Sequence, residues 1–490
     1  MRRRGGWFWL SRPGRRAVLW RLAAVLLGCV PLLLAEAGCR LLGLGVASES
    51  DPFVGFAGSR PLFELSEDGA EYRISPARLN FFRPAKFAAQ KPPGTSRIFI
   101  LGGSTVQGHP FATETAFPRL LQCCLERLDP QRRWEVINCG GVSYASYRLL
   151  PVLQEVLQYE PDVCVFCEGQ NEFLEDITYG SRRGVSERVG PLLSLLLRLQ
   201  CVRAVTGLTS AAAAEQRPLL PAEVLTRLDQ SDGLARFHRD DRHALQVEQH
   251  FQHSLERMVR LCGARGVPLV LVQPPVNLAD CAPFKTQFSV SAGQQAEVLA
   301  LLQGARAAAV SDRAAALRLA EQAVRLDNRC ALAWYELGQL QLTGGDFESA
   351  KRSLRRAADE DVCPLRMTSG LQGVMQRLAA ERGVPFLNAD ELLAGRCRGG
   401  IVSEQVLVDH VHPSFGGHEE IAVSLAELFE SEGLAGLAGP TAVGWQSAAR
   451  ADCRAVVQGL DDQYFLRGRR TLQALRKWAA GRALEPDLAE

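Results

Sequence analysis

The stretch IFILGGST at residues 98–105 decides the fold that we expect for this chain of 490 residues. Its first four residues are apolar and favour a β-strand, and the two glycines that follow break the strand in a sharp turn. The turn delivers the hydroxyl group of Ser104. Because open α/β sheets carry their chemistry at the carboxyl edge of the parallel strands, we expect Ser104 to lie at that edge.

Two more strand-like runs end in polar loops. The run EVIN at 135–138 leads into CGGVS at 139–143, and the run VCVFC at 163–167 leads into EGQNE at 168–172. Helical patterns separate these runs, and such alternation is typical of a parallel sheet covered by helices on both faces. The sequence therefore predicts an α/β fold with three layers, α/β/α, in which these loops open at one edge.

The later part of the chain continues this pattern. A further strand is expected at 267–273, and the loop after it should reach the same edge, so we expect Asn277 on the substrate side. The pattern resumes with a strand at 384–388 and closes with a helix near 416–430.

The sequence DHVHP at 409–413 supplies the groups that a serine nucleophile needs. A serine hydroxyl is a weak nucleophile at neutral pH, and a histidine held in one tautomer by a carboxylate activates it. Asp409 and His412 are the candidates for these two roles. We interpret two other histidines structurally, His109 as part of an exposed loop and His418 as part of a helix start.

These segments resemble the signature blocks of the SGNH (GDSL-type) hydrolase family, which carry in order a nucleophilic Ser, a Gly N–H, an Asn amide and an Asp-x-x-His pair. GGST at 102–105 matches the first block, GQNE at 169–172 the third and DHVH at 409–412 the fifth. The resemblance covers roughly residues 97–173, 266–284 and 384–430.

The resemblance implies a flavodoxin-like parallel sheet and ester hydrolysis through an acyl-enzyme, without a metal or an organic cofactor. It implies that Ser104 is the nucleophile, His412 the general base and Asp409 the carboxylate that orients the base. The side-chain amide of Asn171 would be one donor of the oxyanion hole, together with backbone N–H groups.

Two positions depart from the family pattern. The first block usually reads Gly-Asp-Ser, and Gly103 stands in place of the Asp, which is not a member of the triad. In the second block, Ser143 occupies the position of the donor glycine. Because every residue except Pro keeps its backbone N–H, we expect a donor within Gly141–Ser143, with the glycines supplying the turn.

We expect the substrate to be a carboxylic ester, either a small molecule or an O-acyl group of an envelope glycan or lipid. One alternative is O-acyl transfer to an envelope polysaccharide, in which a sugar hydroxyl replaces water as the acceptor. A third hypothesis, from another functional class, is a scaffold whose helical repeats bind a protein partner while the hydrolase domain is inert.

The N-terminus predicts an attachment to the membrane. Seven arginines precede the first acidic residue, Glu36, and the segment 22–35 is apolar and uncharged. Positive residues before an apolar stretch predict a cytoplasmic N-terminus, a single transmembrane helix at 17–44 and an extracytoplasmic catalytic domain. A cleaved signal peptide is the main alternative, and a lipid anchor fits less well. The net charge is +2, so the chain beyond these arginines is acidic and nucleic acid is excluded as a partner.

An alanine- and leucine-rich segment interrupts the α/β pattern between Asn277 and Asp409. A shift of 34 positions aligns Gly304 with Gly338 and Ala316 with Ala350, which is the period of tetratricopeptide (TPR) repeats. We therefore predict an all-α, TPR-like insertion that could bind a protein partner. A helical hairpin inserted only for bulk is the alternative.

The chain has 14 cysteines, but no spacing among them is typical of a metal site, and most are expected to be small buried residues. The predicted organisation comprises a basic cytoplasmic N-terminus (1–16), a transmembrane anchor (17–44), a lead-in segment (48–94), a hydrolase domain in two parts (95–295 and 365–436), the helical insertion between them (296–364) and a C-terminal helical extension (437–490).

Overall fold

The computed structural model describes residues 51–58, 60–179, 217–230, 233–437 and 444–483, together with residues 27, 30–31, 33–39 and 41. The chain forms two compact units, one made of residues 1–57 with 177–220 and the other of residues 58–176 with 221–490.

The predicted membrane anchor at 17–44 falls largely outside the described residues. Within the described part of the chain, no helix is both long enough and apolar enough to cross a bilayer. In the first unit, the N–H of Gly55 donates to the carbonyl of Pro218 at 2.9 Å, where β1 (Gly55–Ala57) pairs with β8 (Leu219–Pro221).

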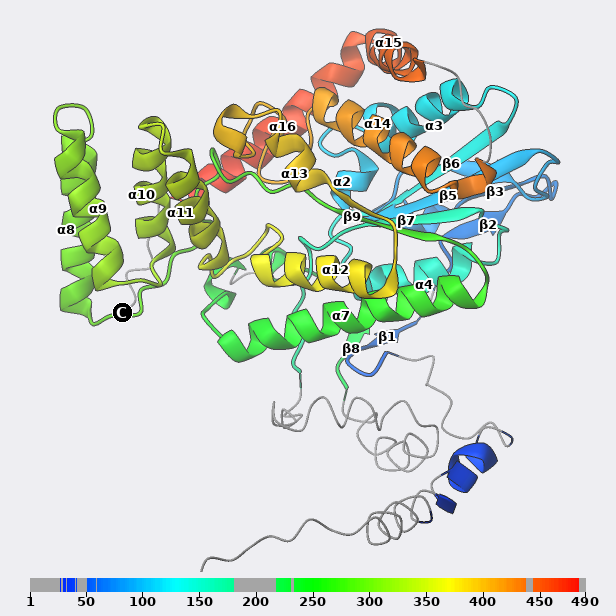
Figure 1. Cartoon of the computed structure of the whole chain (residues 1–490), viewed down its shortest axis with the longest axis horizontal. Coiled ribbons are helices and arrows are strands. Elements are labelled where there is room, and N and C mark those ends of the chain that lie inside the picture. The colour runs from blue at the N-terminus through cyan, green and yellow to red at the C-terminus, as the bar shows by residue number, and fades with distance from the viewer. Residues whose placement is uncertain are drawn as a thin grey trace, which may run out of the picture. The chain divides into compact units, whose positions relative to one another are not determined.

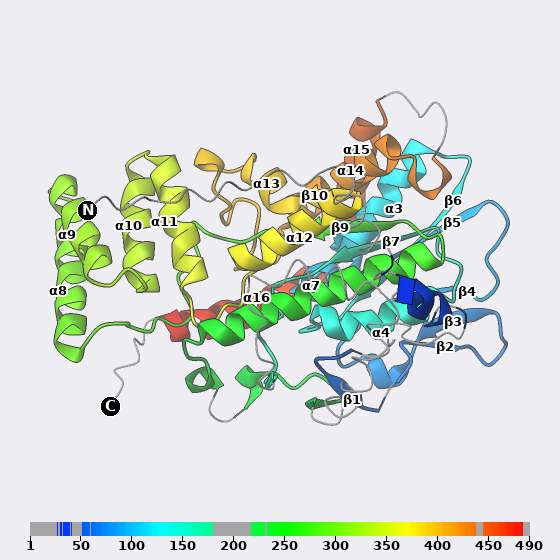
Figure 2. The same ribbon diagram turned by 60° about the horizontal axis from the view of Figure 1, so that its bottom comes forward.

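Among the described residues, the second unit is built on a five-stranded sheet in the order β10-β9-β7-β5-β6, with every pair parallel (Figure 1). Its strands are β5 (Thr95–Gly102), β6 (Arg133–Gly140), β7 (Val163–Cys167), β9 (Leu269–Gln273) and β10 (Phe386–Asn388). Helices cover both faces of this sheet: α3 (Phe117–Leu128) and α14 (Phe415–Ser431) on one, and α4 (Ser146–Val156), α7 (Asp241–Ala264) and α12 (Ser369–Arg382) on the other (Figure 2). The predicted α/β fold with a parallel sheet is confirmed.

Strand β5 lies in the interior of the sheet, between β6 and β7, and all its residues are buried. A parallel strand covered on both faces is apolar over most of its core-facing length, which is why the run at 98–101 does not alternate with polar residues. Ile98 and Ile100 pack in the core beneath α3, whereas Phe99 faces the other way, with its ring centroid 5.3 Å from that of Phe87.

The lead-in segment forms an antiparallel sheet of β2 (Phe63–Leu65), β3 (Glu71–Ile74) and β4 (Lys86–Ala88). Its aromatic side chains meet the central sheet: the ring of Phe63 lies 5.0 Å from that of Phe87, which in turn contacts Phe99 of β5. These contacts place the segment beside the central sheet.

The insertion folds into antiparallel hairpins, α8 (Ala292–Ala308) with α9 (Arg313–Leu326) and α10 (Ala331–Thr343) with α11 (Phe347–Asp359). Small residues of the 34-residue period lie where the helices touch. A Cβ at Gly338 would lie 2.7 Å from Cγ of Leu354, and Ala350 and Ala357 are fully buried. The TPR identity of these hairpins stays a prediction.

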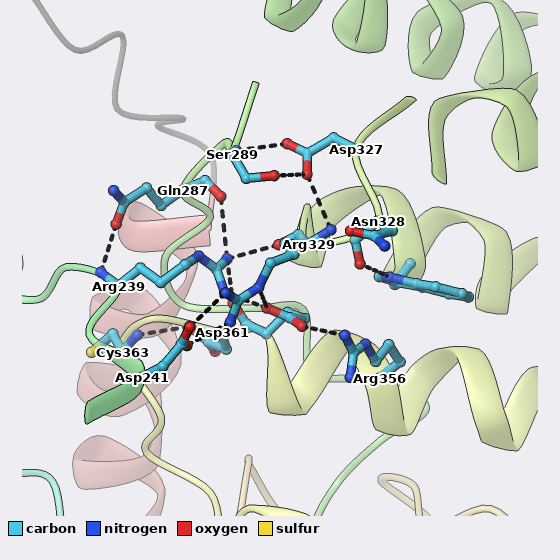
Figure 3. A network of polar contacts seen from close by, with 12 residues as sticks. Arg239, Asp241, Gln287, Ser289, Asp327, Asn328, Arg329, Arg356, Asp361 and Cys363 are labelled. Carbon is cyan, nitrogen blue, oxygen red and sulfur yellow. Dashed lines mark hydrogen bonds and ion pairs between the residues drawn. The ribbon is translucent and has the colours of Figure 1, made fainter. Parts of the chain in front are cut away.

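The two ends of the insertion meet at Arg239, which precedes α7 (Figure 3). The backbone N–H of Arg239 donates to Oε1 of Gln287 at 2.7 Å, and its guanidinium group forms an ion pair with Glu360. Arg329 of the hairpin segment binds Asp241 at 2.6 Å in the same network. The insertion therefore leaves and rejoins the α/β part of the chain at one place.

The cysteines of the described segments are free thiols, and most are buried, as expected. Burial raises the pKa of Cys123 to about 11, so this thiol stays protonated and unreactive at neutral pH. The same cause raises the pKa of Cys330 to about 12.

We expect Arg97→Met to destabilise the fold strongly. Arg97 is 0% exposed and donates to Glu135 at 2.9 Å and to the carbonyls of Tyr159 and Ala88. The substitution leaves a largely buried carboxylate without its nearer, buried partner, so the free energy of unfolding should fall by about 3–5 kcal/mol in chemical denaturation. Arg133→Met is the matched control, because Arg133 approaches the same Glu135 from an exposed position at 3.9 Å and should contribute less than about 1 kcal/mol. Equal losses in both variants would contradict this account.

Candidate active site

Ser104 is the first residue of α2 (Ser104–Gln107), a short helix that begins where β5 ends. The turn requires Gly102, because a Cβ at this position would lie 2.2 Å from the carbonyl oxygen of Cys167. At Gly103, a Cβ would lie 2.1 Å from Oε2 of Glu168. The two glycines thus allow β5 to end tightly against β7, and they place Ser104 at the carboxyl edge of the sheet, as predicted.

His412 approaches Ser104 from the loop that precedes α14. Its Nε2 lies 2.7 Å from Oγ of Ser104, and its Nδ1 lies 2.6 Å from Oδ2 of Asp409. The other oxygen of Asp409 accepts the backbone N–H groups of Val411 at 3.0 Å and His412 at 2.9 Å. The structure therefore brings the three predicted side chains within direct hydrogen-bonding distance.

The electrostatic surroundings favour an ionised Asp409. Burial opposes ionisation, but the rings of His412 and His410 and the hydrogen bonds that the carboxylate accepts outweigh burial and hold the pKa of Asp409 well below its usual range. Burial lowers the pKa of His410 to about 4 and that of His109 to about 3. These two rings are neutral at physiological pH and do not repel a positive charge that forms on His412.

Gly141 and Ser143, the two candidate donors of the second block, differ in whether their backbone N–H already has an acceptor. The N–H of Gly141 donates to the carbonyl of Gly102 at 2.9 Å, and backbone carbonyls also accept the N–H groups of Val142 and Tyr144. Ser143 adopts a left-handed conformation with φ 62°, and its N–H has no acceptor among the described residues. Ser143 is thus the residue of this turn whose N–H is free to bind an oxyanion.

Asn171 lies in the loop that follows β7. Its Nδ2 donates to the carbonyl of Tyr144 at 3.1 Å, which uses one of the two N–H groups of the amide. A Cβ at Gly103 would lie 2.6 Å from this Nδ2 atom, so the amide lies beside the residue that precedes Ser104. The second N–H can therefore serve a ligand at Ser104.

Asn277 has a different place from the one that we expected. It is 1% exposed, and its Nδ2 donates to the carbonyl of Asp409 at 3.0 Å, while its N–H donates to the carbonyl of His410. Its own carbonyl accepts from Arg366 at 3.0 Å. Asn277 therefore supports the loop that carries Asp409, and the substrate-side role that we expected is wrong.

His109 is not the exposed loop residue that the sequence suggested. Its ring centroid lies 5.2 Å from that of His412, and its Nδ1 is buried. His109 thus lies beside His412, yet within the described ranges no three His, Cys, Asp or Glu side chains gather as metal ligands would. The short separation of His109 from Ser104 in the sequence was the signal that could have placed it near the site.

The C-terminal helix α16 (Asp462–Ala483), for which the sequence predicts no chemical role, contacts the loop before Asp409 and the loop after Ser104. The guanidinium group of Arg476 donates to the carbonyl of Val408, one residue before Asp409, at 2.9 Å. Tyr464 binds the loop that follows Ser104 through the hydroxyl group of Thr115, at 2.7 Å. Helix α16 therefore connects the loop of the serine with the loop of the histidine.

The chain matches no protein-family model and no curated protein. Among solved structures, it is similar to a lipase/acylhydrolase from Enterococcus faecalis, with 14% identity and a TM-score of 0.31 over 69% of this chain and 96% of that chain. A protein from Desulfitobacterium hafniense, described as lipolytic and of the G-D-S-L family, has 11% identity and a TM-score of 0.29 over 68% and 99%. A mutant acetyl-xylooligosaccharide esterase from Geobacillus has 12% identity and a TM-score of 0.29 over 69% and 93%.

We expect Asn171→Ala to lower kcat on a short-chain aryl ester by about 10²–10³, with little change in KM, because the lost donor acts mainly on the charge that develops in the transition state. Steady-state kinetics of the purified variant measures both constants. An effect on KM alone would instead place Asn171 in ground-state binding and remove it from the oxyanion hole.

Proposed function

We propose that this chain hydrolyses carboxylic esters through an acyl-enzyme formed on Ser104. The observation that carries the proposal is the continuous path of hydrogen bonds from Ser104 through His412 to Asp409, at 2.7 and 2.6 Å. An ionised Asp409 accepts the Nδ1–H of the imidazole, so the lone pair of Nε2 is directed at the serine proton. This is the arrangement that a serine hydroxyl needs to act as a nucleophile at neutral pH.

In this mechanism, Oγ of Ser104 attacks the ester carbonyl while Nε2 of His412 takes the hydroxyl proton. The oxyanion accepts hydrogen bonds from the N–H of Ser104, the N–H of Ser143 and the amide of Asn171. His412 then returns the proton to the leaving alcohol as the C–O bond breaks and the acyl group stays on Ser104. Water completes the cycle by attacking the acyl-enzyme while His412 takes one of its protons, and His412 then gives this proton to Oγ of Ser104 as the bond between Oγ and the acyl carbon breaks and the carboxylic acid leaves.

The proposed substrates are esters outside the cytoplasm, either small molecules or O-acyl groups of envelope glycans or lipids. The arginines before the apolar stretch 22–35 support this, because they predict a membrane anchor with the rest of the chain outside. The hairpins α8–α11 are proposed as a TPR-like module that binds a protein partner or a polymer, supported by their 34-residue period and by the buried alanines between the helices.

The insertion also braces the loop behind the triad. Arg355 of α11 forms an ion pair with Asp390 at 2.8 Å, and Asp390 accepts the N–H of Val276 at 2.9 Å. The next residue, Asn277, holds the carbonyl of Asp409. The module therefore has a structural connection to the site in addition to its proposed role in binding.

We expect Ser104→Ala to lower kcat on short-chain aryl esters by at least about 10⁴-fold and to abolish labelling by a fluorophosphonate, because the nucleophile is lost. Circular dichroism should be unchanged, since a single hydroxyl group is removed. The control is Ser431→Ala, at the exposed end of α14, which should be labelled like the wild type. Normal labelling of the Ser104 variant would contradict the assignment of the nucleophile.

Replacing residues 289–358 with a short Gly/Ser linker tests the module. The linker can rejoin the chain because Gln287 and Glu360 both bind Arg239, and the excision keeps Asp361, which caps the N–H groups of Phe284 and Lys285. If the module recruits a polymer, the excised protein should keep kcat/KM on a small ester within about tenfold of the intact protein, because only binding remote from Ser104 is lost. Its kcat/KM for deacylation of envelope glycan should fall by a larger factor.

Arg355→Met is the matched control for the excision, because it cuts the bracing contact and keeps the module. If this single substitution reproduces the loss on the glycan, the module acts by supporting the catalytic loop, and the binding role is contradicted. Equal activity of the excised and intact proteins on both substrates would also contradict it.

A further inference from the structure

A second buried carboxyl group, Glu168, lies beside the proposed oxyanion hole. It follows β7 directly and is 0% exposed. Its Oε1 accepts the backbone N–H groups of Gly169, Gln170 and Asn171, each at 3.0 Å. Because these amides are consecutive, one oxygen atom sets the path of the loop that carries Asn171.

The other oxygen of Glu168 is directed at Gly103. Oε2 is buried and has no hydrogen-bond partner within the described part of the chain. It would lie 2.1 Å from a Cβ at Gly103, and Nδ2 of Asn171 would lie 2.6 Å from the same point. The carboxyl group therefore occupies the space that a side chain at Gly103 would fill. The first block that this chain resembles has Asp there, and here a carboxyl group enters the space from position 168.

The protonation state of this group matters for the site. Burial raises the pKa of Glu168 to about 8, with a further contribution from Glu172 and opposition from the three N–H groups. The group is thus mainly protonated at neutral pH. Since Oε1 accepts three N–H groups, the proton belongs on Oε2. An ionised Glu168 would instead place a negative charge next to the developing oxyanion, where little water screens it.

The surroundings of Glu168 provide little compensation for a negative charge. On its own loop it faces Glu172, which is also acidic, and the main influences on its pKa include no cation. Between β5 and α2 it faces Gly103, which carries no charge. Thr105 of α2 accepts a hydrogen bond from the neighbouring Gln170, and Met367 packs on Gly169. The titratable groups of the loop on the far side of Ser104 are Asp409, His410 and His412.

We infer that Glu168 is a positioning residue that acts in its protonated form: Oε1 holds the Asn171 loop, and Oε2 keeps the space beside Gly103 free of negative charge. The inference rests on the proposed hydrolase function. The inference predicts that kcat falls as pH rises through the ionisation of Glu168. A histidine base does not cause such a fall, because it stays deprotonated at alkaline pH.

Glu168→Gln is the decisive variant, because a glutamine amide resembles the protonated acid. It keeps an oxygen for the three N–H groups and a donor beside Gly103. We expect kcat at pH 7 to fall by less than about threefold, and we expect the decline of kcat above about pH 8 to disappear. Glu168→Ala should lower kcat by about 10²-fold at pH 7, since the loop loses its acceptor.

Glu172→Gln is the matched control. Glu172 is also buried, with a pKa raised to about 7 by burial, but its oxygens accept from Ser146 at the start of α4. This variant should keep the alkaline decline of the wild type. A decline that persists in Glu168→Gln, or one that disappears in Glu172→Gln instead, overturns the inference.

A second readout does not depend on catalysis. The raised pKa means that folded Glu168 keeps a proton that the unfolded chain releases, so this group lowers stability as pH rises from about 4.5 to about 8. Glu168→Gln should therefore melt at a higher temperature than the wild type at pH 8 and show a smaller change from pH 5 to pH 8. Identical melting profiles overturn the inference. A wild-type protein that melts as expected but hydrolyses no ester contradicts the proposed function and leaves the protonated state of Glu168 supported.

Discussion

The hydrogen bond between Ser104 and His412 is the contact on which the rest of the structure depends, because it joins side chains 308 positions apart. The serine is held rigidly at the end of a buried interior strand. Among the residues that the structure describes, the β-pairing of the histidine loop is an isolated bridge between Leu407 and Pro413. It is fixed by contacts from elsewhere, with Asn277 behind it and Arg476 beside it.

The parts of this arrangement that the sequence predicts are those with local signals. A buried parallel strand contains a continuous apolar run, so β7 and the second half of β5 can be recognised in the sequence. The end of β5 is visible because only glycine tolerates the approach of a neighbouring carbonyl at 102. Asp409 and His412 are three residues apart, so their mutual geometry is also local. These reasons explain why the α/β sheet and the three side chains that meet at its edge could be predicted.

The rest depends on contacts between distant segments, which have no local pattern. The sequence shows only that Gly103 stands where the resembled family usually has Asp. The structure shows that the carboxyl group of Glu168 lies in the space beside Gly103. Asn277 follows a strand in the way that substrate-binding residues do, and its hydrogen bonds to the Asp409 loop become apparent only when both loops are placed. Ser143 and Gly141 are equal candidates until the acceptor of each N–H is known. The anchor and the TPR identity of the insertion stay predictions.

The position of α16 links the completeness of the site to the order of protein synthesis. Arg476 and Tyr464 bind the two loops that carry the histidine and follow the serine, yet both loops leave the ribosome before this helix does. A nascent chain that ended before Asp462 would contain Ser104, Asp409 and His412 and lack the helix that connects their loops. The complete arrangement of the site therefore arises only after α16 has been synthesised.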